Sequence, residues 1–212
     1  MSPQLLPQMK HQLTLYLFVI ILFAVGVVFG TLMVGALTLE QQQNLGDELS
    51  SFIQYISAGI FPNEAQSFWS SLWFHAKWLL LIWVLGLTVV GMPFVLALDF
   101  LKGVLVGFTI GTLISQHAWK GLLFSLVSVA PPNLLAVPAL MVASVAALSF
   151  SLVVIRSRLI GRQGPLLRPA VSFVTTMAVM FLALVGAAFV DAYLSPSLMQ
   201  WAAPLVSPAA AG

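Results

Sequence analysis

The sequence predicts an all-α membrane protein, a polytopic bundle of five spanning helices with its N-terminus inside and its C-terminus outside. Two features of composition support this fold class, because 60% of the 212 residues are hydrophobic and only 7% are charged. A soluble domain carries roughly 25% charged residues, and a chain this short must expose much of its surface. The third feature is that the apolar residues lie in runs near the ~20 residues that a helix needs to cross a bilayer.

The apolar runs predict where each span lies. The first run is longer than the apolar core of about 7–15 residues in a signal peptide, so we expect an uncleaved anchor. The second contains Pro93, which predicts a kink. The third is short and requires Lys102 to extend its ammonium to the interface. We expect spans at residues 13–37, 78–98, 100–117, 134–155 and 170–193.

The uncharged run 121–155 is too long for one span. As a single helix it would measure about 50 Å, against a hydrocarbon core of roughly 30 Å. Pro131 and Pro132 interrupt it, and Asn133 is a suitable N-cap for the helix that follows. We therefore expect a half-helix at 122–130 that re-enters the membrane or lies along its edge. The break should face the bundle interior, because non-helical backbone in a bilayer needs protein or water around it.

The basic residues orient the bundle, since they concentrate in cytoplasmic segments. A basic loop at 156–169 then faces the cytoplasm, and the acidic segment 38–76 lies outside. The residues assigned to the cytoplasm are Lys10, Lys102, Arg156, Arg158, Arg162 and Arg168, and those assigned to the outside are Lys77 and Lys120.

The outer segment 38–76 predicts a docking surface. Apolar residues from Leu45 to Ile56 recur at the spacing of an amphipathic helix, and Asn63 is placed to cap a second helix. The segment also carries aromatic side chains, which suit a membrane interface or a partner protein. The residues selected for partner docking are Phe52, Trp69 and Trp73.

Glycines at four-residue spacing predict close packing of helices. Such glycines remove side chains from one helix face and let a neighbouring backbone approach. Packing within the chain is the first interpretation, because the chain has helices of its own to pair, and homo-oligomerisation is the second. The residues in question are Gly26, Gly30, Gly103, Gly107 and Gly111.

Charged residues near the spans receive a structural interpretation. Asp99 and Lys102 are expected at the cytoplasmic turn between the second and third spans, where charged residues extend to the interface. Asp191 is expected near the outer end of the last span, as an interfacial carboxylate rather than a cation or proton site. An ion relay through Asp99 and Lys102 is the functional alternative.

The sequence predicts no enzyme. The chain has no cysteine, its histidines lack the spacing of a zinc motif, and no serine lies in a nucleophile elbow. We therefore expect no catalytic residues, no metal and no cofactor. The net charge of +2 is too small to indicate nucleic acid as a partner.

Several motifs, taken in order, resemble those of the stage II sporulation protein M family over nearly the whole chain. One departure is Ala130-Pro131-Pro132-Asn133, where a single proline is expected. The motifs are His75-Ala76-Lys77, Trp83-Val84-Leu85-Gly86, Phe100-Leu101-Lys102-Gly103, Gly107-Phe108, Gly111 and Pro132-Asn133-Leu134.

The resemblance implies a role in sporulation. Family members act when the mother-cell membrane engulfs the forespore, as scaffolds for two peptidoglycan-degrading partners, stage II sporulation proteins D and P. It implies a multi-pass protein of the septal or engulfing cell membrane. The alternative from the residues is a transporter or permease subunit whose pathway runs near the broken helix, with Ser125, Ser128 and Asn133 along it.

Overall fold

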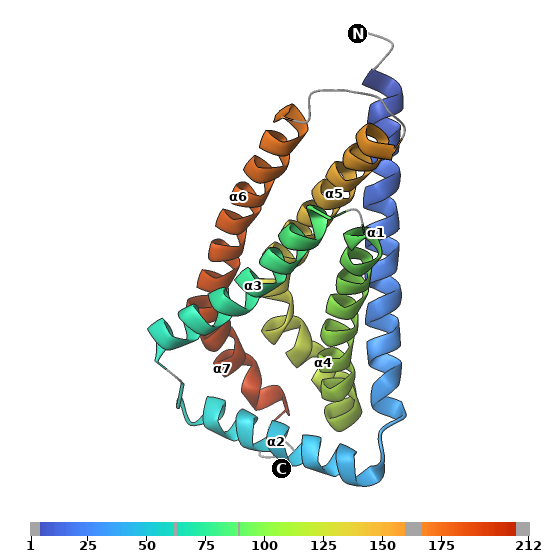
Figure 1. The fold of residues 1–212 in the computed structure, drawn as a ribbon. Coiled ribbons are helices and arrows are strands. Elements are labelled where there is room, and N and C mark those ends of the chain that lie inside the picture. Colours follow the sequence, from blue (N-terminus) through green and yellow to red (C-terminus); the bar gives the residue numbers. More distant parts are fainter. Residues whose placement is uncertain (1–4, 62, 89, 160–166, 207–212) are drawn as a thin grey trace.

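The computed structural model describes residues 5–61, 63–88, 90–159 and 167–206, and this part of the chain is helical without a strand. The helices lie side by side in a bundle with two distinct ends (Figure 1). Their bounds are α1 (Leu5–Gly35), α2 (Leu39–Ser57), α3 (Glu64–Gly86), α4 (Gly91–Ser128), α5 (Ala130–Leu159), α6 (Leu167–Phe189), a π-helical turn η1 (Val190–Leu194) and α7 (Ser195–Val206).

Five segments in the described part of the chain are long and apolar enough to cross a membrane. The all-helical fold and the number of spans are therefore as the sequence predicts, and the chain is a multi-pass membrane protein. The spans are Gln12–Gly35, Glu64–Gly86, Gly91–Ser128, Ala130–Ile155 and Leu167–Pro204.

The glycine-rich faces of α1 and α4 pack directly on each other. A methyl group on Gly30 would collide with the carbonyl oxygen of Val104, and one on Gly107 would collide with that of Val27. Thr31 lies in this seam, where its hydroxyl donates to the carbonyl of Gly107 at 3.0 Å. Gly26, Gly103 and Gly111 lie in the same seam. The glycine spacing thus brings together two helices of one chain.

The helix α2 does not span but lies across one end of the bundle (Figure 1). The helix begins with a capping box. The Thr38 hydroxyl accepts a hydrogen bond of 3.3 Å from the Gln41 backbone N–H, and the Gln41 side-chain oxygen accepts one of 3.0 Å from the Thr38 backbone N–H. Ile53 and Ile56 on its inner face are buried, and it packs against α7. Its amphipathic sequence suits this position between the bundle and the solvent or headgroups.

The predicted outer segment 38–76 is too long, and the predicted span 78–98 is wrong. Asn63 does cap a helix, since its side chain accepts from the Ala65 N–H at 3.0 Å, but that helix continues without a break to Gly86. The chain then reverses, and α4 begins at Gly91. Pro93 occupies the first turn of α4, where its missing N–H needs no partner, so it starts a helix rather than kinking one.

The early start of α4 overturns two further expectations. The predicted span 100–117 begins at Gly91 instead, so Asp99 and Lys102 lie inside a long helix rather than at a turn. Both side chains are buried, with exposed fractions of 5% and 7%. Lys102 therefore does not extend to an interface, and neither residue is the interfacial charge that the sequence predicts.

The helix α4 changes direction at Ala118, whose backbone is non-helical with φ 50° and ψ −127°. The piece 119–128 folds back on the preceding turns, because a methyl group on Gly121 would collide with the carbonyl oxygen of Leu113. This piece takes the place of the predicted half-helix 122–130. A second interruption follows at Val129, after which α5 begins.

Pro131, Pro132 and Asn133 lie inside the first turn of α5, which begins at Ala130 rather than after Asn133. Proline is compatible with a first helical turn, whose N–H groups have no partner within the helix. Asn133 does not cap α5, because its side-chain amide donates to the carbonyl of Val129 at 2.8 Å. The predicted span 134–155 therefore starts too late.

The helix α5 is the most buried of the spans. Small side chains, including the buried Ala136, Ala143 and Ala147, let α1, α3, α4 and α6 approach it. Phe150 stacks on Phe173 of α6, with ring centroids 5.0 Å apart. These contacts make the core of the bundle.

The last predicted span, 170–193, corresponds to α6 and η1, and α7 continues beyond it. Both ends of the predicted loop 156–169 are helical, because α5 extends to Leu159 and α6 begins at Leu167. Residues 160–166, which include Arg162, lie outside the described residues.

Candidate functional site

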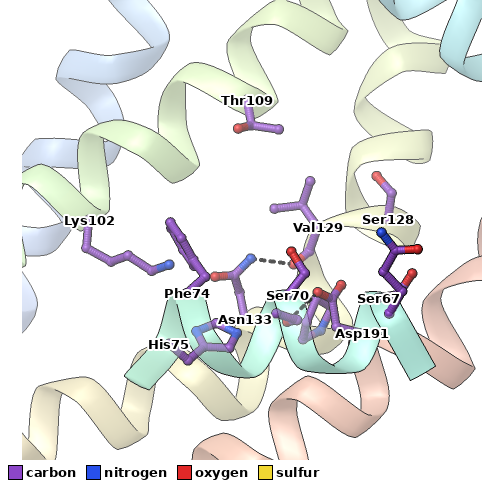
Figure 2. A pocket seen from close by; sticks show the side chains of 13 residues that line it. Ser67, Ser70, Phe74, His75, Lys102, Thr109, Ser128, Val129, Asn133 and Asp191 are labelled. Carbon is purple, nitrogen blue, oxygen red and sulfur yellow. Dashed lines mark hydrogen bonds between the residues drawn. The ribbon is translucent and has the colours of Figure 1, made fainter. Parts of the chain in front are cut away.

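An open polar cavity of about 660 Å³ lies between α3, α4, the α4–α5 junction and η1 (Figure 2). Its wall combines charged, hydroxyl and amide side chains with a few apolar ones. In a helical membrane bundle such groups are costly unless they have partners or meet a ligand. The lining residues are Gln66, Ser67, Ser70, Ser71, Phe74, His75, Lys102, Thr109, Ser128, Val129, Pro132, Asn133 and Asp191.

Lys102 brings a buried positive charge to the cavity. Its ammonium lies 4.9 Å from the ring centroid of Phe74 and 5.7 Å from that of Trp78, both on α3. A cation over a ring face is stabilised by the ring quadrupole, by up to about 2 kcal/mol where water is excluded. No carboxylate among the described residues forms an ion pair with this ammonium. The aromatic rings therefore support the charge without neutralising it.

Asp191 brings the opposite charge from η1. Its Oδ2 accepts a hydrogen bond of 2.7 Å from the Ser71 hydroxyl of α3, and the side chain is half-buried. A π-helical turn shifts the helix register locally, and such turns are frequent at functional sites. Asp191 is thus part of the cavity wall. It lies between α6 and α7, within the span Leu167–Pro204, and not near the outer end of the last span as the sequence predicts.

His75 is buried on α3. Along that helix it lies between Ser71, which contacts Asp191, and Trp78, which contacts Lys102. Its Nδ1 has no hydrogen-bond partner in the structure, and its ring is 5.8 Å from that of Phe74 in an edge-on arrangement. Buried polar atoms are usually paired. The unpaired imidazole nitrogen therefore indicates that water or a ligand completes this site.

The interruption between α4 and α5 contributes further polar groups to the cavity. The Asn133 amide donates to Val129, which holds the side chain at the cavity wall (Figure 2). Ser128 also lines the cavity, whereas Ser125 is buried elsewhere and donates to the carbonyl of Leu122 at 2.8 Å. Two of the three residues predicted along a pathway thus meet at one cavity.

Asp99 is not among the residues that line the cavity. The Ser144 hydroxyl of α5 donates to its Oδ1 at 2.7 Å, and its Oδ2 has no partner in the structure. Although Asp99 and Lys102 are one turn apart, Lys102 faces α3 and Asp99 contacts α5. The two side chains thus contact different helices, and the ion relay that was the functional alternative stays untested.

The predicted docking residues lie apart from the polar cavity. Phe52 is on α2, and Trp69 and Trp73 are on the outer face of α3, where each is 65% exposed. The ammonium of Lys77 lies 5.4 Å from the ring centroid of Trp73. These aromatic side chains remain available for lipid or for a partner.

The model of the family Stage II sporulation protein M matches residues 19–196, which include all the residues that line the cavity, three spans in full and most of the first and last spans. The chain belongs to the stage II sporulation protein M family. It is accordingly a sporulation-related membrane protein, as the order of the motifs indicates. No curated protein and no solved structure matches the chain.

Sequence reasoning did not predict that Lys102, His75 and Asp191 of this family member share a cavity. The available signals were a lysine inside an apolar run and the hydroxyl-bearing face of α3 formed by Ser67, Ser70 and Ser71. Sequence reasoning started the third span at residue 100, which placed Lys102 at a helix end. The lysine was therefore not recognised as a charge inside an apolar helix. Among the described residues, no three His, Asp or Glu side chains converge as a metal site would require.

Proposed function

We propose that this protein is a non-catalytic membrane scaffold that recruits and anchors peptidoglycan-degrading partners at the septal membrane during engulfment of the forespore. Membership of the stage II sporulation protein M family supports a role in sporulation. The observation that carries the scaffold role is α2, a helix that lies across one end of the bundle instead of spanning it (Figure 1).

The surface of α2 has the composition of a docking site. Ile53 and Ile56 anchor the helix on the bundle, while Phe52 and Tyr55 are exposed beside them. Exposed aromatic side chains within a polar rim are typical of the residues that dominate binding between proteins. The acidic residues of this helix, which supply the rim, are Glu40, Asp47 and Glu48.

The basic residues favour an outward position for this surface. Arg168 lies at the start of α6, at the opposite end of the bundle from α2. Positive residues concentrate on the cytoplasmic side, so α2 and α7 would face the compartment that contains the cell wall. The resemblance of the motifs to the family implies that the partners in that compartment are stage II sporulation proteins D and P.

Alanine substitution of the exposed aromatic residues tests this proposal. We expect the triple variant Phe52→Ala, Trp69→Ala and Trp73→Ala to recover at least tenfold less of both hydrolases when it is affinity-purified from sporulating cells. The matched control is Phe94→Ala with Trp83→Ala, which removes exposed aromatic residues from the other end of α3 and the start of α4. Equal recovery of the hydrolases by the triple variant and by wild type would place the docking surface elsewhere.

A second function, passage of a solute, is favoured by one observation. The polar cavity reaches Ser128, Val129 and Asn133 at the α4–α5 interruption, and discontinuous helices mark the binding sites of many transporters. Solute flux into liposomes that contain only the purified protein would support this function. If liposomes that contain the wild-type protein are no more permeable than protein-free liposomes, solute passage is excluded for the solutes tested.

A further inference from the structure

Two opposite charges face the polar cavity without forming an ion pair. Lys102 and Asp191 lie on different sides of it, with Phe74 and Asn133 between them (Figure 2). The Lys102 ammonium lies over the rings of Phe74 and Trp78, and Asp191 accepts a hydrogen bond from Ser71. An ion held in a medium of low dielectric constant is stable only when other charges or dipoles surround it. The cavity is therefore matched to a ligand that carries both a negative and a positive group.

The cavity continues into an apolar groove of about 420 Å³ between α2, α4 and α7. Thr109, Ser128 and Val129 line both spaces, so the polar and apolar parts share a wall. Glu48 is the one charged residue that lines the groove among the described residues. Most of the groove is formed by Leu45, Leu49, Phe52, Phe108, Leu113, Phe124 and Met199.

The joined spaces match an amphiphile better than a small polar solute. The apolar side chains of the groove offer an acyl chain of a membrane lipid a surface to pack against, in place of neighbouring lipid tails. A soluble ion would use only the cavity and leave the groove without an occupant. Ser70 and Thr109 are exposed at the cavity wall, which places its opening between α3 and α4.

We propose that this site binds a phospholipid whose headgroup carries both a phosphate and a primary ammonium. The phosphate accepts from the Lys102 ammonium, the ammonium group donates to Asp191, and an acyl chain occupies the groove. The unpaired Nδ1 of His75 and the side chain of Asn133 lie within the same cavity to complete the polar contacts. Phe52 lines the groove and also belongs to the proposed docking surface on α2, so lipid binding is measured on the purified chain, where no hydrolase is present.

Native mass spectrometry of the full chain, delipidated in mild detergent, tests the proposal with defined lipids. We expect one bound phosphatidylethanolamine per chain, weaker binding of phosphatidylglycerol, which lacks the ammonium, and none of diacylglycerol, which lacks both charges. Lys102→Met should weaken the binding of both phospholipids at least tenfold, and Lys102→Arg should retain part of that binding. Asp191→Asn should remove the preference for phosphatidylethanolamine and leave phosphatidylglycerol unchanged.

Matched variants separate specific binding from general lipid adhesion. Lys77→Met removes a lysine that contacts Trp73 outside the cavity, so its lipid binding should equal that of wild type. Thr109→Trp alters an exposed side chain shared by both spaces, and should block the lipid while soluble phosphoethanolamine still binds. Thermal unfolding of each variant identifies any that fail to fold.

Three results would overturn the proposal. The first is equal lipid occupancy in Lys102→Met, Lys77→Met and wild type, with all three folded. The second is binding of soluble phosphoethanolamine as tight as that of the lipid, because the groove would then contribute nothing. The third is a folded Thr109→Trp variant that keeps full lipid binding.

Discussion

Ser144 of α5, which is fully buried, donates a hydrogen bond of 2.7 Å to Asp99 of α4. The contact joins two spanning helices through a carboxyl group whose other oxygen has no partner in the structure. Because both side chains are buried, water cannot take the place of either partner if the contact is lost. It therefore contributes to the alignment of α4 against the central helix of the bundle.

Loss of the Ser144 hydroxyl should destabilise the bundle. Ser144→Ala leaves the Asp99 carboxyl without its donor, and an unsatisfied buried polar group costs about 1–3 kcal/mol. We expect a corresponding fall in the free energy of unfolding, measured in detergent with denaturant. Ser149→Ala, a half-buried serine on the same helix, should have a smaller effect. If the two variants are equally stable, the contact with Asp99 contributes nothing.

The α1–α4 seam should not tolerate a methyl group. Gly107→Ala places a Cβ against the carbonyl of Val27, and overpacking of this kind typically costs about 1–3 kcal/mol. Gly186→Ala on α6 is the matched control, since a methyl group there meets no atom within 4 Å. Denaturant unfolding in detergent should show reduced stability for Gly107→Ala alone. Similar stability of both variants would argue against close packing in the seam.

Replacement of Ala118 by glycine should stabilise the protein. Ala118 has φ 50°, a conformation that glycine adopts without the steric cost of a Cβ. We expect Ala118→Gly to raise the free energy of unfolding by up to about 1 kcal/mol. Ala183→Gly, within the regular helix α6, should instead lower it by a similar amount. Destabilisation by both substitutions would mean that the turn at Ala118 is not strained.

The two ends of the bundle should lie on opposite sides of the membrane. The chain has no cysteine, so single-cysteine variants report position directly. Glu48→Cys on α2 should react with a membrane-impermeant maleimide added outside cells, and Arg168→Cys at the start of α6 should react only after permeabilisation. Both positions are exposed in the structure. Labelling of both from the same side would contradict the predicted orientation.

Sequence reasoning placed both ends of the first span and the start of the last span within a few residues, because polar or proline-containing segments flank them. It ended the last span too early, because the helix continues through η1 into α7. It failed between residues 64 and 117, where apolar and aromatic residues continue with few interruptions and several helix boundaries fit equally well. Gly91 and Pro93 illustrate the difficulty, since the same residues are compatible with a kink inside a helix and with the start of one. The turn before Gly91 is defined by how α3 and α4 pack on α5.

The sequence alone determined that this chain is a membrane-embedded helical protein and which family it belongs to, because hydrophobic length and glycine spacing are local properties. The cavity depended on tertiary structure. Lys102 and Asp191 are far apart in the chain, and only the packing of α3, α4 and η1 brings them to the same space. Burial inside that packing, rather than residue type, places a lysine expected at an interface in the wall of a cavity.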